Sequence, residues 1–226
     1  MGLHPDGDAP QPTATTFPVA PLPNTQVWRD FRLVTLAAGM ALGLFAQIGL
    51  LAHLFSLLVP ALGAQFAGFT AGGATAAAIL GRTLVGWLMP AHADRRLFGC
   101  ANYVVQISGS LAFLFAAGDD IPLLLLGVVL FGAGIGNNTS LPPMIAQAEF
   151  SKEDVSRVVP LIVAIGQGTY AFAPAVFGFI RGLAPHSGSV SAGAAPWPFL
   201  AAALIQTLAV VAFFIGRPAR RDATRA

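Results

Sequence analysis

Charged residues are scarce in this chain. Asp, Glu, Lys and Arg together make up 10% of its 226 residues, compared with about 25% in a typical soluble domain. Hydrophobic residues make up 55%, and the mean hydropathy is +0.71. From Leu33 to Gly81 the sequence contains no Asp, Glu, Lys or Arg. A soluble fold with such a surface would aggregate, so the composition indicates a membrane protein in contact with the lipid bilayer.

Several residue patterns that would indicate other functions are also missing. Cys100 is the only cysteine, which excludes an internal disulfide and a paired-cysteine metal site. The His-Glu-x-x-His pattern of membrane metalloproteases is absent. The net charge is only +2, and the basic residues are spread along the chain. We therefore expect no metal, no cofactor and no nucleic-acid partner.

The few charged residues divide the chain into apolar runs that can be compared with the about 20 residues of a membrane-spanning helix. The run from Leu33 to Gly81 is long enough for two spans, with a turn between Val59 and Gln65. Four further runs lie within residues 97–118, 121–148, 158–180 and 182–216. The sequence thus predicts an all-α polytopic membrane protein, with six transmembrane helices within residues 28–216.

Proline and capping residues refine these predictions. The fourth span is expected to break near Pro142 and Pro143. The fifth follows Ser151 and Asp154 as candidate caps, with Pro160 in its first turn. The sixth is expected to begin near residue 196.

The predicted spans contain no Asp or Glu, which argues against a carboxylate proton relay. His53 is the one group in them with a pKa range suited to proton exchange. A rhomboid-type protease would need a nucleophile in the fourth span and a histidine in the sixth. The Ser108-Gly109 step lies in the third span, and the sixth has no histidine. We therefore expect no enzyme.

Two tails flank the predicted spans. Residues 1–27 contain Asp6, Asp8 and several prolines, unlike a signal peptide, and are predicted to form a disordered cytoplasmic tail or linker. Residues 217–226 form a basic cytoplasmic tail. One side of the predicted topology receives Arg29, Arg32, Arg95, Arg96, Lys152, Arg157, Arg217, Arg220, Arg221 and Arg225, and the other receives Arg181. The positive-inside rule therefore places both termini in the cytoplasm of a cell whose plasma membrane holds the chain.

Arg82 is a charged residue inside the second predicted span, where a charge costs about 2.5 to 3.5 kcal/mol on insertion scales. Its side chain could extend to the cytoplasmic interface. Alternatively, it could face a wet cavity and donate to an anionic group such as a carboxylate. Uncharged polar residues could bond between helices or contact a ligand: Gln47, His53, Asn137, Asn138, Thr139, Gln167 and Tyr170. The stripe of Asn102, Gln106 and Ser110, and Gln206 in the last span, are interpreted as packing.

Four runs of sequence resemble a known family. They are GLFAQIGLLAHL, AAAILGRTLVGWLMPAHADRR, GIGNNTSLPPMIAQAEF and VVPLIVAIGQGTYAFAPAVFGFIRGL. In order and spacing they resemble the C-terminal six helices of a major facilitator superfamily transporter, over residues 28–216. The resemblance implies alternating access, in which two six-helix halves rock about a central site. It also implies that the first, second, fourth and fifth helices line the cavity, which places near the substrate Gln47, Arg82, Asn137, Asn138, Gln167 and Tyr170.

Arg82, four residues before Gly86, also resembles the cavity arginine of the monocarboxylate and oxalate-porter branch, which implies an organic anion as the small-molecule substrate. The loop after the second helix departs from the family motif. That motif has aspartate four residues after its first glycine and arginine next, whereas this sequence has proline and alanine there. Asp94, Arg95 and Arg96 follow later, so we interpret the segment as a degenerate gating loop.

The resemblance covers one half of such a transporter. We therefore expect a half that works with a second six-helix half, either another copy of the chain or a separate chain. The alternative is a truncated or remnant membrane protein without transport activity of its own, or a partner-binding membrane subunit.

Overall fold

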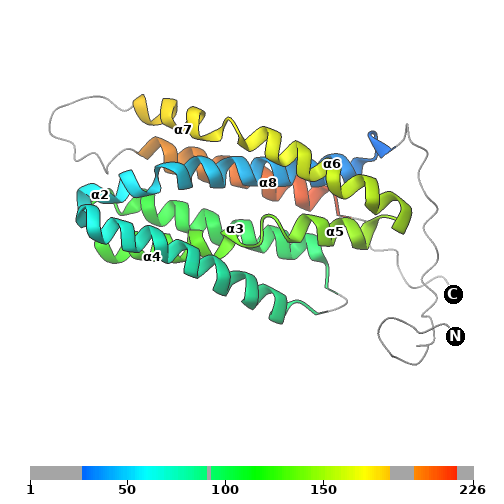
Figure 1. The fold of residues 1–226 in the computed structure, drawn as a ribbon, viewed down its shortest axis with the longest axis horizontal. Coiled ribbons are helices and arrows are strands. Elements are labelled where there is room, and N and C mark those ends of the chain that lie inside the picture. The colour runs from blue at the N-terminus through cyan, green and yellow to red at the C-terminus, as the bar shows by residue number, and fades with distance from the viewer. Residues whose placement is uncertain (1–26, 91–92, 184–195, 218–226) are drawn as a thin grey trace, which may run out of the picture.

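The protein is an elongated bundle of helices (Figure 1). The computed structural model describes residues 27–90, 93–183 and 196–217, so most of the two predicted tails lies outside the described residues. The regular structure within these ranges is α-helical, which confirms the all-α prediction. Its elements are α2 (Phe31–Leu88), α3 (Arg95–Phe115), α4 (Ile121–Ile135), α5 (Leu141–Glu149), α6 (Lys152–Tyr170), α7 (Ala173–Gly182) and α8 (Pro196–Ile215).

Helix α2 is a hairpin. Gly63 interrupts it with φ 72° and ψ 162°, a combination that is open essentially only to glycine. Figure 1 shows the chain reversing there, so that α2 has a first arm (residues 31–62) and a second arm (residues 64–88) that run in opposite directions. The turn predicted between residues 59 and 65 is therefore confirmed.

Gly63→Ala should lower the free energy of unfolding by about 1 to 3 kcal/mol, because alanine is strained in this backbone conformation. A Cβ at Gly63 would have no heavy atom within 4 Å, so a clash would not contribute. The measurement is an SDS unfolding titration of the purified chain in mixed micelles. Gly68→Ala is the matched control, since its Cβ would meet only Phe55 at 4.0 Å. Equal losses in the two variants would contradict the strain argument.

Two of the predicted helical runs are interrupted. Between α4 and α5 the break lies at residues 136–140, before Pro142 and Pro143 and not at them. These prolines occupy the first turn of α5, where a missing N–H breaks no helical hydrogen bond. The second break, between α6 and α7, lies at residues 171–172 and was not predicted. It directly precedes the first turn of α7, which contains Pro174.

The start of α6 agrees with one of its two predicted caps, but it precedes the predicted apolar run. Ser151 is the N-cap, and its Oγ accepts a hydrogen bond from the backbone N–H of Asp154 at 3.2 Å. The helix therefore begins at Lys152 and not near Val158, and Pro160 lies inside it instead of in its first turn. The capping role predicted for Ser151 is confirmed, whereas Asp154 belongs to the first turn.

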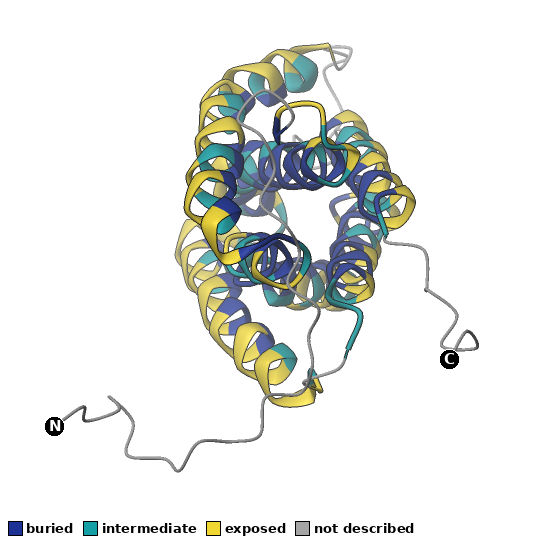
Figure 2. Cartoon of the chain, turned by 90° about the vertical axis from the view of Figure 1, so that its right-hand side faces the viewer, coloured by how far each residue is buried: buried dark blue, intermediate teal, exposed yellow. Residues whose placement is uncertain are grey.

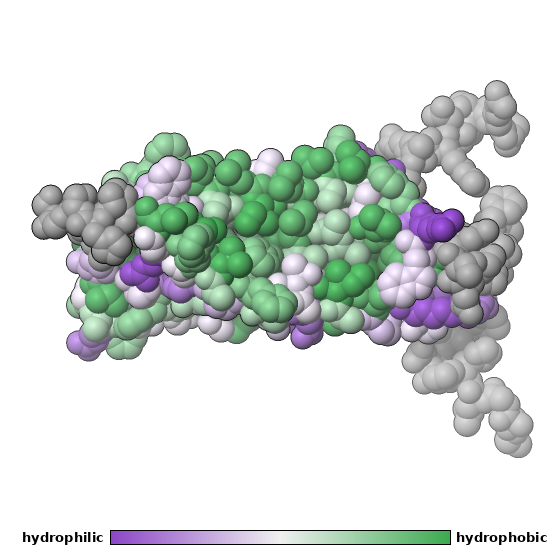
Figure 3. Space-filling view, turned by 90° about the horizontal axis from the view of Figure 1, so that it is seen from above, coloured by the Kyte–Doolittle hydropathy of each residue, from purple (hydrophilic) through white to green (hydrophobic). Residues whose placement is uncertain are grey.

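Four helical segments are long and apolar enough to cross a membrane: α2, α3, residues 152–182 of α6 and α7, and α8. The short apolar helix α4 has 15 residues. Figure 3 shows hydrophobic side chains over the middle of the visible face, with hydrophilic ones gathered mainly near its ends. The structure thus supports the interpretation as a membrane protein.

The end view in Figure 2 shows buried residues mainly on the inward faces of the helices and exposed residues on the outward faces. One hydrophobic cluster, which includes Met40, Tyr103 and Phe213, lies toward the end where α2 starts and α8 finishes. A second cluster includes Phe131 and Phe177.

Candidate functional site

Arg82 lies in the second arm of α2, beside the break between α4 and α5. Its Nε donates a hydrogen bond to the carbonyl oxygen of Gly136 at 2.8 Å, and its Nη2 donates one to Oγ1 of Thr139 at 3.2 Å. The residue is exposed, and Nη1 has no hydrogen bond within the described ranges. The guanidinium is therefore anchored along one edge while its other edge can still bind a carboxylate.

The break at residues 136–140 explains why an acceptor is available to Arg82. In an unbroken α-helix the N–H of Ser140 would bond to the carbonyl of Gly136. Here it bonds instead to the carbonyl of Asn137 at 3.2 Å. The Gly136 carbonyl oxygen accepts from the guanidinium of Arg82 and from Oγ of Ser140 at 3.3 Å. The broken helix thus turns a backbone carbonyl toward a cation on a neighbouring helix.

Behind this break, amide side chains from three helices and from the break itself meet in the interior. None of them is more than 6% exposed. We call this group the buried amide network, and its members are Gln47 of α2, Asn102 and Gln106 of α3, Asn137 and Asn138 of the break, and Gln206 of α8.

Asn138 is at the centre of the buried amide network. Its Nδ2 donates to Oε1 of Gln47, and its Oδ1 accepts from Nδ2 of Asn102 at 2.9 Å and from Nε2 of Gln106 at 3.2 Å. Oε1 of Gln106 in turn accepts from Nε2 of Gln206 at 3.0 Å. Hydrogen bonds thus run from α2 through the break and α3 to α8.

Asn102 connects the network to the backbone at the break. Its Nδ2 also donates to the carbonyl oxygen of Gly134 at 3.1 Å, and its Oδ1 accepts from Nδ2 of Asn137 at 3.0 Å. A buried carbonyl or amide without a partner is costly. This side chain from α3 therefore helps to satisfy the polar groups where the helix is interrupted.

The structure joins residues that the sequence analysis separated. The resemblance implies that Gln47, Asn137 and Asn138 lie near the substrate and that the amides of α3 and α8 make packing contacts. Gln47, Asn137 and Asn138 are only 2–3% exposed, and they belong to the buried amide network together with the amides of α3 and α8. The division came from the helices that the resemblance assigns to the cavity, whereas the contacts depend on how the helices are rotated against each other.

Gln167 and Tyr170 lie on α6, away from the buried amide network. Gln167 is exposed, and Tyr170 is partly buried against the first hydrophobic cluster. Neither side chain has a hydrogen bond to Arg82 in the described structure. Their place beside the substrate therefore stays a prediction. His53, also singled out from the sequence, lies within 3.0 Å of the carbonyl oxygen of Pro174 and so links α2 to α7.

A buried ion pair lies at the end of the bundle where α2 starts. Arg96 is fully buried, and it donates from Nε and Nη2 to the two carboxylate oxygens of Glu149 at 2.7 and 2.8 Å. It also donates to Oγ1 of Thr35 and to the carbonyl oxygen of Arg32. Such bidentate, charge-assisted contacts are strong and directional. They join α2, α3 and the end of α5.

The other residues of the predicted gating loop also make contacts within the chain. Asp94 caps α3 and pairs with Arg217 at 2.8 Å, and Arg95 donates to the carbonyl oxygen of Met144 at 2.6 Å. Gly86 is exposed, with no atom within 4 Å of where a Cβ would lie. The structure thus places these charges in contacts that tie helix ends together, and their gating role stays a prediction.

Sequence reasoning missed Glu149 and Arg32. Arg32 donates to the backbone carbonyl of Glu149 at 2.8 Å, lies over the ring of Phe150 and pairs with Asp30. Burial alone would raise the pKa of the Asp30 carboxyl, but the hydrogen bonds from Arg32 outweigh it, so this pKa lies below its ordinary value. The sequence did contain a signal for this contact, because Glu149 is an acidic residue at the basic end of the fourth predicted span.

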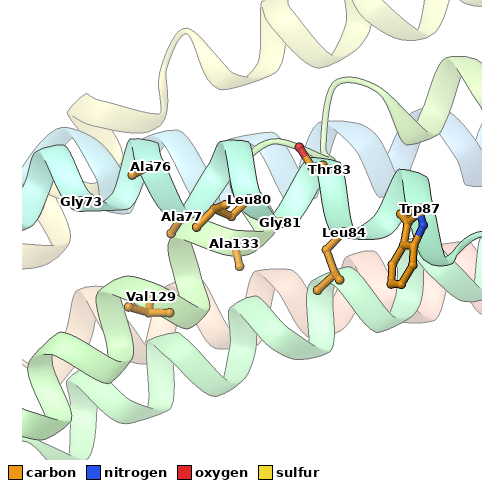
Figure 4. A pocket seen from close by; sticks show the side chains of 10 residues that line it. All are labelled: Gly73, Ala76, Ala77, Leu80, Gly81, Thr83, Leu84, Trp87, Val129 and Ala133. Atoms are coloured by element: carbon orange, nitrogen blue, oxygen red, sulfur yellow. The ribbon is translucent and has the colours of Figure 1, made fainter.

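An apolar groove is separate from these polar groups. It has a volume of about 590 Å³ and is lined by the second arm of α2 together with Val129 and Ala133 of α4. Figure 4 shows Leu84 and Trp87 projecting beside it. Residues on a helix are separated by about 100°, which puts Arg82 on the far side of α2 from the groove centre. The groove carries no charged side chain and is not the candidate anion site.

No family model matches this chain, and neither the curated proteins nor the solved structures include a significant match to it.

Proposed function

We propose that this chain is one half of a secondary-carrier transporter for a small organic anion and that it crosses the membrane six times. In this proposal α2 crosses twice because it reverses at Gly63. The pairs α4 with α5 and α6 with α7 each form one interrupted crossing, and α3 and α8 each cross once. The long apolar helices support this topology. Interrupted helices are tolerated in a membrane where other groups satisfy the freed backbone, as they do at residues 136–140.

The proposed orientation places both termini in the cytoplasm of a cell whose plasma membrane holds the chain. The start of α2 and the end of α8 lie at the same end of the bundle (Figure 1). The described basic residues of that end include Arg32, Arg96 and Arg217. Such an excess of lysine and arginine is typical of the cytoplasmic side.

A second six-helix half, either another copy or a separate chain, covers part of the outer surface in this proposal. In an apolar 18-residue window of residues 152–182 only 22% of the residues are buried, compared with 44% in such a window of α8 and 50% in those of α2 and α3. Most residues of the second arm of α2 are exposed as well, among them Phe66 and Phe69. These two poorly covered elements correspond to the second and fifth of the four helices that the resemblance assigns to the cavity.

The observation that carries the substrate proposal is the geometry of Arg82. Because Nε and one N–H of Nη2 bond to Gly136 and Thr139, a bound carboxylate uses the remaining donors of Nη1 and Nη2. The anchored edge limits the freedom of the side chain, so less entropy is lost on binding. A small carboxylate, with two acceptor oxygens, fits this end-on approach.

Arg82→Ala should reduce uptake of labelled lactate or oxalate by membrane vesicles at least about tenfold, because a charge-assisted hydrogen bond contributes about 1.5 to 3 kcal/mol. Arg82→Lys should retain partial uptake with a raised KM, since an ammonium cannot hold the Gly136 carbonyl and present a second planar edge. The measurement is initial-rate uptake at matched protein levels.

Lys152→Ala is the control, since this exposed cation lies at the start of α6 and should leave uptake unchanged. Equal uptake by wild type and Arg82→Ala would remove the anion proposal. Uptake no greater than in vesicles without the chain would remove the proposal that two copies of this chain form the transporter. It would favour a chain that needs a separate second half or has no transport activity of its own.

A further inference from the structure

We propose that the buried amide network is a positioning device for Arg82, holding the α4–α5 break in the arrangement that presents the Gly136 carbonyl to the guanidinium. This inference rests on the proposed function, in which Arg82 binds the substrate. The network performs this role without direct contact with the substrate.

The network is placed to hold the break, because Asn137 and Asn138 are themselves residues of the break. Asn138 is bonded to Gln47 on α2 and to Asn102 on α3, so two helices fix its side chain. Asn102 also bonds to the Gly134 carbonyl and to the Asn137 side chain. The residues on both sides of Gly136 are thus fixed by the same α3 side chain.

The break is also held close to the helix that carries Arg82. A Cβ added to Gly136 would overlap the backbone carbonyl oxygen of Ala78, one turn before Arg82 on α2. Glycine therefore permits direct contact between the break and α2. In this tight contact, a small displacement of the break changes the distance from the Gly136 carbonyl to the guanidinium.

Burial distinguishes a positioning role from a ligand role. Asn138 is 2% exposed and Gln106 is fully buried, whereas Arg82 is exposed. The amides also use their donors and acceptors on each other, and Gln206 accepts a further bond from Ser110 at 3.3 Å. A solute could reach the guanidinium without reaching these side chains.

The chemistry of amides explains why the break is held in one arrangement. Each carboxamide both donates and accepts, so a chain of them is satisfied only when every helix has the matching rotation and depth. Loss of Asn138 removes the central member. Ser140 N–H can then return to the Gly136 carbonyl as in a regular helix, which withdraws that oxygen from Arg82.

The test measures hydrogen exchange of the Arg82 Nε–H by NMR of the full chain, labelled with ¹⁵N-arginine in detergent micelles. The Arg82 signal is assigned by its absence from Arg82→Lys. We expect Asn138→Leu to raise the exchange rate at least about tenfold, since a hydrogen bond to a charged group is lost. Gln206→Met, at the far end of the network, should raise it by about threefold.

Tyr103→Phe is the matched control. It removes another buried hydrogen bond of α3, from Tyr103 Oη to the Gly39 carbonyl at 3.1 Å, without touching the network. We expect its exchange rate to equal that of wild type. If Asn138→Leu fails to fold, Gln206→Met decides the question. Exchange rates in Asn138→Leu and Gln206→Met equal to the control would overturn the positioning role.

Uptake kinetics separate this inference from the proposed function. Asn138→Leu should raise the KM for lactate or oxalate about tenfold and change kcat by less than about twofold, since it misplaces Arg82 without removing its charge. If wild type takes up neither anion but the exchange rates respond as expected, the network still positions Arg82 and the transport proposal fails. If uptake requires Arg82 and the exchange rates do not respond, transport stands and the positioning role fails.

Discussion

Arg96→Ala should lower the free energy of unfolding by about 3 to 5 kcal/mol, because it leaves the carboxylate of Glu149 without its buried partner. Arg96 is fully buried, and Glu149 is 9% exposed at its side chain. The variant also removes donors from Oγ1 of Thr35 and the carbonyl of Arg32. The measurement is the shift of an SDS unfolding titration in mixed micelles.

Two further variants separate lost charge pairing from lost packing. Glu149→Ala should be destabilised by a similar amount, since it leaves the Arg96 guanidinium buried and unpaired. The double variant Arg96→Met with Glu149→Leu should recover much of the loss, because it removes both charges and keeps apolar volume. Arg29→Ala, at an exposed position outside the pair, is the control and should stay within about 0.5 kcal/mol of wild type. If Arg96→Ala also stayed within about 0.5 kcal/mol of wild type, the structural role of the Arg96–Glu149 pair would be contradicted.

Gly81→Ala should lower the free energy of unfolding by about 1 to 3 kcal/mol, because the new methyl group forces two helices apart. A Cβ at Gly81 would overlap the backbone carbonyl of Ala133 on α4. Backbone cannot rotate away as a side chain can, so the second arm of α2 has to shift. That shift would also move the neighbouring Arg82, so we expect carboxylate uptake to fall as well.

Gly72→Ala is the matched control in the same arm of α2. A Cβ there would meet nothing within 4 Å, and the position is exposed. Alanine is favoured over glycine inside a helix by about 0.5 to 1 kcal/mol, so this variant should be as stable as wild type or slightly more stable. Similar behaviour of the two variants would show that α2 and α4 do not pack as closely as the structure indicates.

The sequence predicted those features of the fold whose signals lie within a few neighbouring residues. The glycine turn at Gly63 and the cap at Ser151 were found because each depends on a few neighbouring residues. The fourth span was expected to break near Pro142 and Pro143, but the break precedes them because they fit the first turn of α5. Pro160 was expected in a first turn, but it lies inside α6 because that helix already begins at Lys152.

The candidate site was predicted only in part. Arg82 was singled out as an unusual charge, but its partners Gly136 and Thr139 are more than fifty residues away in the chain. Glu149 was missed for the same reason, since 53 residues separate it from Arg96. No local pattern relates residues so far apart.

By itself the sequence determined that this chain is helical and built for a membrane, because apolar composition and the length of apolar runs depend on the residues alone. It also identified the rare polar side chains in those runs, since each is unusual there whatever its neighbours. Only the tertiary structure decided which of them meet. The hydrogen bonds of Asn138 depend on the rotation and depth of each helix against the others, and packing across the whole bundle sets these.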